Sequence, residues 1–242
     1  RDREPILSLL PPLDKLKIPV IGSPLFIISN PDLVIAQCKA GVIGSFPCLN
    51  AREGEGEPNM LEIWLNKINE ELDKYNQENP DNPAAPYAVN HIVHKSNVRL
   101  QQDIDICAKW KAPVWITSLG ARPEVNEVAH QANGIVLHDI INNFFAKKAI
   151  EKGADGLVAV AAGAGGHAGT LSPFALIQEI REWFDGPLLL SGSIANGGAV
   201  LAAQAMGADL AYIGSAFIAT NEANADQRYK EMITESSADD IV

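Results

Sequence analysis

The sequence predicts an α/β protein that folds as a single (β/α)8 barrel, the TIM-barrel architecture. Its length of 242 residues, of which 47% are hydrophobic, suits one large domain with a substantial core. Eight short apolar runs recur along the chain, and a segment with helical spacing follows each run. Residues 153–160 also resemble residues 207–214, a separation of about two βα units. This strict alternation favours a closed barrel.

Each expected strand is rich in β-branched or aliphatic residues. The eight strands are residues 18–22, 42–46, 87–90, 114–118, 134–137, 157–161, 187–191 and 210–214. The expected helices are residues 31–40, 61–75, 98–111, 124–131, 142–152, 173–183, 198–206 and 224–234. Several helices run into a glycine that is expected to form a left-handed cap before the next strand: Gly41, Gly134, Gly153 and Gly207.

An open, doubly wound sheet is the competing architecture. It would require a Gly-x-Gly-x-x-Gly turn after the first strand, and Gly22-Ser-Pro-Leu25 does not provide one. We expect residues 1–242 to form one domain, with residues 50–59 and 76–86 as polar surface loops. The sequence stops at Val242 within an expected helix, which is compatible with a short missing C-terminal segment.

Charge and apolar patterning argue against nucleic acid and membrane partners. Thirty acidic and nineteen basic residues give a net charge of −11, and the basic residues are scattered rather than clustered. We find neither an apolar stretch of about 18 to 20 residues nor a charged-then-apolar leader, so a cytoplasmic protein is expected. The cysteines Cys38, Cys48 and Cys107 lack metal-ligand spacing, so neither a disulfide framework nor a metal site is expected.

Functional groups of such barrels collect just after the carboxyl ends of the strands. The residues there are polar or glycine-rich in this sequence: 23–25, 90–91, 118–120, 138–139, 163–169, 191–193 and 214–215. The turns Ser191-Gly192-Ser193 and Gly214-Ser215 are small enough for backbone N–H groups to approach an anion. They therefore predict a phosphate site, although ordinary tight turns also use Gly and Ser.

The run Gly163-Ala-Gly-Gly-His-Ala-Gly169 follows the sixth strand and has one ionisable side chain, His167. A loop so poor in side chains can lie flat against a planar ligand. Histidine has an ordinary pKa near 6.5, which suits proton abstraction at neutral pH. We therefore expect His167 to be a catalytic base, with a structural histidine as the alternative.

The other histidines divide by their positions. His138 ends the fifth strand and is expected to face the same site, where it could stabilise charge on a reduced cofactor. His91 and His94 follow the third strand and either line the pocket or lie in a solvated loop. His130 is on a helix and is expected at the surface.

With these turns placed after strands six, seven and eight, the chain resembles the nitronate monooxygenases, formerly called 2-nitropropane dioxygenases. The resemblance covers nearly the whole chain, and its specific element is Ala164-Gly-Gly-His-Ala-Gly169; residues 21–25, 89–90, 190–193 and 213–215 add to it. It implies an FMN-binding barrel that oxidises alkyl nitronates with O2 to a carbonyl compound and nitrite. His167 matches the base with which some members deprotonate the neutral nitroalkane.

The resemblance also implies the cofactor contacts. Ser23, Pro24, Leu25 and Asn90 would contact the isoalloxazine, Gly165 and Gly166 would lie against it, and His138 would lie near the ring; the phosphate would be held by Ser191, Gly192, Ser193, Gly214 and Ser215. Two positions depart from the family pattern. Leu25 stands where many relatives have methionine, and His138-Asp139 replaces a commoner basic pair.

Two other functions fit the same sequence. A flavin-dependent NAD(P)H reductase of the enoyl-acyl-carrier or quinone reductase type would share the glycine-histidine loop. A non-redox barrel that binds a phosphate-bearing metabolite would share only the anion turns. The sequence leaves the physiological substrate, the use of NAD(P)H and the oligomeric state open, a homodimer included.

Overall fold

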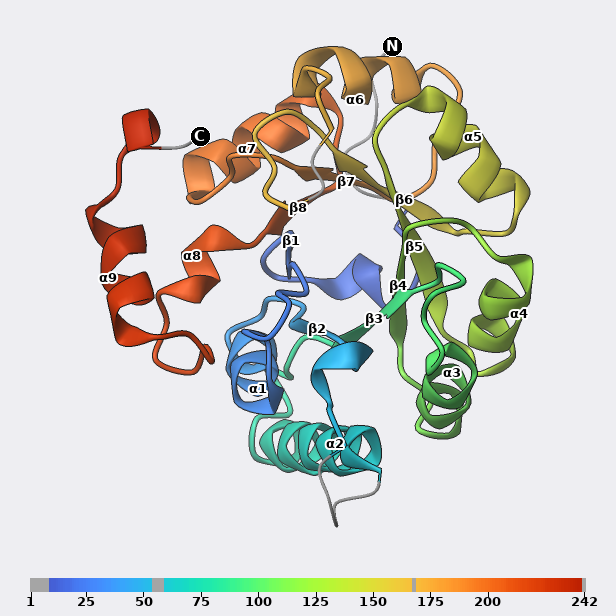
Figure 1. The fold of residues 1–242 in the computed structure, drawn as a ribbon, viewed down its shortest axis with the longest axis vertical. Coiled ribbons are helices and arrows are strands. Elements are labelled where there is room, and N and C mark those ends of the chain that lie inside the picture. The colour runs from blue at the N-terminus through green and yellow to red at the C-terminus, as the bar shows by residue number, and fades with distance from the viewer. Residues whose placement is uncertain (1–8, 54–58, 167–168, 241–242) are drawn as a thin grey trace.

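Eight parallel strands form a barrel surrounded by helices in the computed structural model, which describes residues 9–53, 59–166 and 169–240 (Figure 1). The strands are β1 (Val20–Gly22), β2 (Ser45–Pro47), β3 (Ala88–Ile92), β4 (Val114–Ser118), β5 (Ile135–Ile140), β6 (Gly156–Val160), β7 (Leu188–Ser191) and β8 (Leu210–Ile213). Their hydrogen-bonded order is β1-β8-β7-β6-β5-β4-β3-β2. The predicted (β/α)8 barrel is confirmed.

The barrel closes between β1 and β2 through a narrow seam. The only pairing recorded there among the described residues is an isolated parallel bridge between Ile21 and Ile43. The Gly22 N–H donates to the Ile43 carbonyl at 2.8 Å, and the Ile43 N–H donates to the Val20 carbonyl at 3.1 Å. The seam therefore has one bridge, whereas each of the seven ladders pairs at least three residues of each strand.

The predicted helices are present, with ends that shift by a few residues. They are α1 (Pro31–Lys39), α2 (Met60–Glu78), α3 (Leu100–Lys109), α4 (Pro123–Gln131), α5 (Asn143–Glu151), α6 (Pro173–Arg181), α7 (Gly197–Met206) and α9 (Gln227–Glu235). Asparagine side chains at Asn30, Asn142 and Asn196 accept backbone N–H bonds and so begin three of them. A short helix that the sequence did not predict, α8 (Ser215–Ile218), directly follows β8. None of the described helices is long and apolar enough to cross a membrane.

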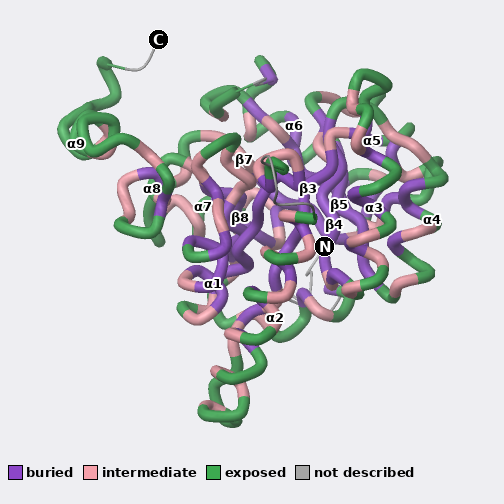
Figure 2. Tube along the Cα trace, turned by 60° about the horizontal axis from the view of Figure 1, so that its bottom comes forward, coloured by how far each residue is buried: buried purple, intermediate pink, exposed green. Residues whose placement is uncertain are grey.

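Two apolar layers result from the alternation of side chains along each strand. The barrel interior contains Ile21, Ile116, Leu137 and Leu189, among others. The opposite strand faces pack against the helices, where Trp115 is fully buried. Figure 2 shows the buried segments concentrated along the strands. A polar residue near a strand end therefore faces the interior or the helices according to its parity.

Three of the four predicted glycine caps are confirmed. Gly41, Gly153 and Gly207 have φ angles of 89°, 94° and 115°, in the left-handed region. The prediction for Gly134 is wrong, because the preceding Asn133 takes the left-handed conformation with a φ of 63°. A Cβ atom at Gly134 would lie 2.7 Å from Trp115 Nε1, so glycine is needed there for close packing instead.

The internal sequence repeat corresponds to a repeated hydrogen-bonding motif. Asp155, before β6, accepts the Val136 N–H and contacts His130 Nε2 at 2.8 Å. Asp209, before β8, accepts the Leu188 N–H and contacts Arg181 Nη2 at 2.5 Å. Each aspartate thus ties the start of one strand to the start of the strand before it and to a preceding helix.

The two aspartates are expected to contribute unequally to stability. The Arg181 side chain is 7% exposed and that of His130 is 41% exposed, so Asp209 neutralises a charge that water cannot reach. We expect Asp209→Ala to lower the free energy of unfolding by about 3 kcal/mol. Asp155→Ala should lower it by about 1 kcal/mol. Denaturant unfolding of both variants measures the difference, and equal losses would contradict the assigned role of Arg181.

Candidate active site

Three polar side chains from neighbouring strands form a hydrogen-bonded chain at one end of the barrel interior. Asn90 on β3 donates from Nδ2 to Ser118 Oγ at 2.9 Å and to the Ile116 carbonyl at 3.1 Å. Ser118 on β4 donates to Asp139 Oδ2 on β5 at 2.6 Å. All three side chains point to the barrel interior, because the residues two positions earlier on each strand, Ala88, Ile116 and Leu137, belong to the interior core.

Asp139 has an environment that favours its neutral form. Its Oδ1 atom is shielded from solvent and has no hydrogen-bond partner among the described residues. Burial raises the pKa of this carboxyl to about 6, against the opposing effect of the Ser118 hydroxyl. Tyr212 on β8 faces the same interior, and burial together with the Asp139 charge raises its pKa well above the usual value. A carboxyl group that titrates near neutrality therefore lies at the barrel mouth.

His138 lies on the opposite face of β5 from Asp139. Val136 and Ile140, two residues before and after His138, point to the same side of the strand and belong to the layer between the barrel and the helices. His138 Nδ1 and Thr117 Oγ1 share a hydrogen bond of 2.6 Å. Burial and the Lys152 charge lower the pKa of His138 to about 4, so the imidazole is neutral at neutral pH. This placement does not favour the predicted contact with a ring in the barrel mouth, and Asp139 occupies the inward position instead.

The loops after β6 and β7 are packed together. The Ser193 N–H and hydroxyl donate to the Gly163 carbonyl at 3.0 and 3.2 Å. Gly192 has a φ of 146°, and a Cβ atom there would lie 2.8 Å from the Ala162 carbonyl oxygen. Glycine is therefore required at this close approach. The N–H and hydroxyl of Ser193, a predicted phosphate contact, thus already have a partner within the chain.

The glycine-rich loop has both ends fixed on β6 and its middle open. The Ala162 N–H donates to the Leu171 carbonyl at 2.8 Å, and a Cβ atom at Gly169 would lie 2.1 Å from the Val160 carbonyl oxygen. No atom lies within 4 Å of an added Cβ at Gly165 or Gly166. The backbone there faces open space, as a wall for a flat ligand requires. His167, the predicted base, lies outside the described residues.

The first loop, with Ser23, Pro24 and Leu25, depends on an asparagine from the next βα unit. Asn50 Nδ2 donates to the carbonyls of Leu25 and Ser29 at 3.0 and 2.9 Å, and its Oδ1 accepts the Ile27 N–H at 2.9 Å. The Ser29 hydroxyl accepts the Leu25 N–H at 2.8 Å. Asn50 therefore fixes the loop in a conformation in which Ile27 has a φ of 68°.

The turn after β8 lies directly against this first loop. A Cβ atom at Gly214 would lie 2.7 Å from Ser23 Oγ and 3.2 Å from Leu25 Cδ2. Ser215 follows as the first residue of α8. The predicted residues after β1 and β8 thus form one wall, and those after β6 and β7 form another.

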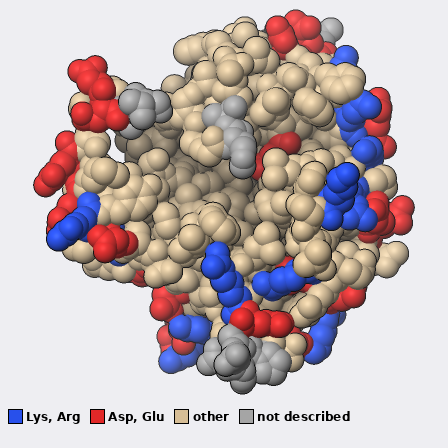
Figure 3. All heavy atoms as spheres, viewed as in Figure 1, with Lys and Arg blue, Asp and Glu red and all other residues tan. Residues whose placement is uncertain are grey.

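The face of the barrel seen in Figure 3 is hollowed at its centre, and Lys and Arg side chains lie towards its rim rather than in the hollow. The wall of small residues, the open space at Gly165 and Gly166 and the unpartnered Asp139 Oδ1 fit a planar heterocycle with polar edges. Two contributors, Asn50 and Asp139, are absent from the predicted cofactor contacts, although Asp139 is among the polar residues expected after the strands. Strand parity could have identified Asp139, because adjacent residues of a strand cannot both face the interior.

Two of the remaining histidines, His91 and His94, lie on β3 and in the loop that follows it. His91 on β3 is buried on the outer face, with its ring centroid 4.9 Å from that of Trp115. His94 is exposed in the following loop, where its Nδ1 and Ser96 Oγ are 2.8 Å apart. Neither histidine therefore joins the inward-facing polar chain.

Comparison with known proteins gives one family. The nitronate monooxygenase family model matches residues 8–242. A nitronate monooxygenase of Paraburkholderia phytofirmans is 25% identical, over 94% of this chain and 70% of that protein.

Two solved structures share the fold. FabK from Thermotoga maritima has a TM-score of 0.78 at 23% identity, over 92% of this chain and 66% of that chain. A nitroalkane oxidase from Streptomyces ansochromogenes has a TM-score of 0.75 at 22% identity, over 92% and 72%. Since the family model covers almost the entire sequence, the chain belongs to the nitronate monooxygenase family and is a flavin-dependent oxidoreductase of the monooxygenase class.

Proposed function

We propose that this protein binds FMN in the hollowed barrel mouth and oxidises alkyl nitronates with O2 to a carbonyl compound and nitrite. The observation that carries the proposal is the open, side-chain-free backbone at Gly165 and Gly166, on the loop after β6, the strand paired with the one that carries Asp139. The family match and the P. phytofirmans nitronate monooxygenase support the substrate class.

The residues around the hollow divide into a ring side and a phosphate side. Ser23, Pro24, Leu25, Asn90 and the two glycines would hold the ring; Ser191, Gly192, Ser193, Gly214 and Ser215 would hold the phosphate through backbone N–H groups and hydroxyls. When bound, FMN supplies the electron acceptor and the reaction with O2. The protein supplies position, exclusion of water and proton transfer.

His167 would act before the oxidation, on neutral nitroalkanes only. An imidazole nitrogen takes the proton from the carbon beside the nitro group, and the C–H electron pair delocalises onto the nitro oxygens. A preformed nitronate has already lost this proton and does not need the base. The described residues on either side of it in the sequence support this role, because the Ala162 N–H donates to the Leu171 carbonyl and Gly169 packs against the Val160 carbonyl oxygen.

Asp139 would provide the complementary hydrogen bond in its protonated form. With a pKa of about 6, the carboxyl is neutral below that pH and donates a proton to a hydrogen bond. Above pH 6 it is anionic and can only accept one. A neutral Asp139 can thus stabilise negative charge on a nitro oxygen or on the ring, and an ionised one opposes it.

A flavin-dependent reductase on the same barrel is the alternative, and the likeness to FabK at 23% identity supports only the shared fold. The two functions differ in what reduces the flavin. Under anaerobic conditions, we expect propyl nitronate to bleach the flavin absorbance rapidly and NADH or NADPH to do so slowly. The reverse order would favour the reductase, and a colourless protein that cannot be reconstituted with FMN would favour a non-redox barrel.

Replacement of the base should separate the two substrate forms. We expect His167→Asn to keep bound FMN and to lower kcat/KM for neutral nitroethane by about a hundredfold or more, because general base catalysis contributes on that scale. Turnover of preformed ethyl nitronate should fall less than about threefold. Oxygen consumption measures both rates; equal losses on both substrates would show that His167 does not act as the base.

The ionisation of Asp139 should appear in the pH profile for preformed nitronate, which does not need the base. We expect kcat/KM to fall as pH rises through about 6, because the donor form of Asp139 is lost. Asp139→Asn keeps a neutral donor at every pH, so its profile should be flat between pH 5 and 8. Ser118→Ala removes a hydrogen bond that favours the ionised form of Asp139. In this variant the decrease in kcat/KM should therefore occur at higher pH. An unchanged profile in both variants would contradict this role.

A further inference from the structure

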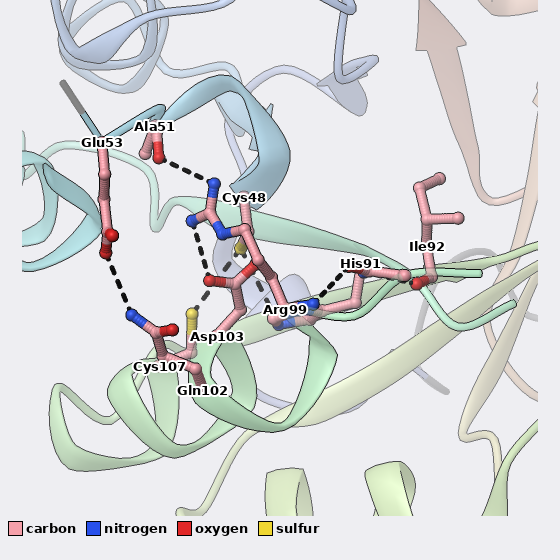
Figure 4. A network of polar contacts seen from close by, with 10 residues as sticks. Cys48, Ala51, Glu53, His91, Ile92, Arg99, Gln102, Asp103 and Cys107 are labelled. Carbon is pink, nitrogen blue, oxygen red and sulfur yellow. Dashed lines mark hydrogen bonds and ion pairs between the residues drawn. The ribbon is translucent and has the colours of Figure 1, made fainter. Parts of the chain in front are cut away.

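Two cysteines and a histidine from distant parts of the chain converge on the outer side of β3, away from the barrel mouth (Figure 4). The ligand atoms of Cys48, His91 and Cys107 all lie within 4.8 Å of one another, and all three residues are buried. Cys48 Sγ is 3.8 Å from Cys107 Sγ and 3.9 Å from His91 Nε2. No step of the proposed reaction uses this cluster.

The spacing of the donors matches tetrahedral coordination. Two thiolates about 2.3 Å from one tetrahedral Zn²⁺ lie about 3.8 Å apart, which is the separation of the Cys48 and Cys107 sulfurs. Thiolate and imidazole are the donors of structural zinc sites, and oxygen-seeking cations such as Mg²⁺ and Ca²⁺ avoid them. The donor set therefore favours zinc.

Asp103 is a buried carboxylate near this cluster, although its oxygens are not among the ligand atoms that lie within 4.8 Å of one another. It is fully buried on α3, one helical turn before Cys107, and its Oδ2 atom has no hydrogen-bond partner among the described residues. Its Oδ1 contacts Arg99 Nη2 at 2.9 Å. An unpartnered buried carboxylate oxygen is costly unless a cation or a donor satisfies it.

Charge balance supports the same assignment. Two thiolates carry two negative charges, which a divalent cation balances, and the nearby Asp103 carboxylate is paired with the Arg99 guanidinium. The complete site is thus neutral, as a buried group should be. Binding would release the two thiol protons.

We propose that Cys48, His91 and Cys107 bind a structural Zn²⁺ ion. The ion would join the turn η2 (Cys48–Asn50) to β3 and α3. Asn50, two residues after Cys48, holds the first loop through its hydrogen bonds to Leu25, Ser29 and Ile27. The metal would therefore stabilise the loop at the barrel mouth from behind, without contact with the substrate.

Cobalt substitution tests the proposal on the full chain. Protein produced in zinc-depleted medium with added Co²⁺ should contain about one cobalt ion per chain. It should also show the intense visible d–d bands of tetrahedral cobalt, at longer wavelengths than flavin absorbs. Cys48→Ser and Cys107→Ser should each lose these bands and most of the metal.

Cys38 provides a matched control. It is a third fully buried cysteine, but its thiol donates to the Pro86 carbonyl at 3.4 Å and lies outside the cluster. Cys38→Ser should keep both the cobalt bands and the metal content. Equal metal content in the Cys38 and Cys48 variants would overturn the proposal.

A measurement on the unaltered protein keeps the test decisive if the cysteine variants fail to fold. Metal analysis of protein produced in zinc-supplemented medium should give about one zinc per chain, and a strong chelator present during heating should lower Tm by several degrees. Wild-type protein that is folded but holds neither zinc nor cobalt would show that the cluster is only a pair of packed thiols beside a histidine.

Discussion

The two-residue period of a β-strand is the constraint on which the site depends. Adjacent side chains of a barrel strand must point to opposite faces, so each strand delivers one set of residues to the interior and another to the helices. At the ends of β3, β4 and β5 this rule sends Asn90, Ser118 and Asp139 inward. The same rule sends His91, Thr117 and His138 outward, where one pair forms a hydrogen bond and His91 joins two cysteines. One alternation therefore creates both the mouth of the barrel and the buried cluster behind it.

The loops around the mouth are held mainly by one another. Ser193 bonds the carbonyl of Gly163, Gly214 packs against Ser23, and Asn50 bonds three backbone groups of the first loop. Each contact joins two loops that follow different strands. Loops arranged in this way keep a fixed cavity without large side chains inside it, which leaves room for a flat cofactor.

The sequence predicted what depends on local pattern. Apolar periodicity located all eight strands and the eight longer helices, but α8, with four residues, is too short to show a period. The cap at Asn133 was missed because asparagine and glycine both adopt the left-handed conformation, and only the packing of Gly134 on Trp115 decides between them.

Long-range contacts were beyond the reach of sequence reasoning. Cys48 contacts His91, 43 residues later in the sequence, and Cys107, 59 residues later. No metal-ligand motif is defined by such long separations. The role of Asn50 depends on loop geometry in the same way. The glycine turns around the mouth were found because their composition is itself unusual. The catalytic role of His167 stays a prediction.

The seam between β1 and β2 has a mechanical consequence. Seven neighbouring strand pairs are joined by ladders. The β1–β2 pair is joined only by the isolated bridge between Ile21 and Ile43 among the described residues. The first loop begins at Ser23, directly after Gly22 at the end of β1, and the turn η2 begins directly after β2. Because Ile21 and Ile43 are both fully buried in the interior core, apolar packing holds this seam closed where ladder hydrogen bonds are missing.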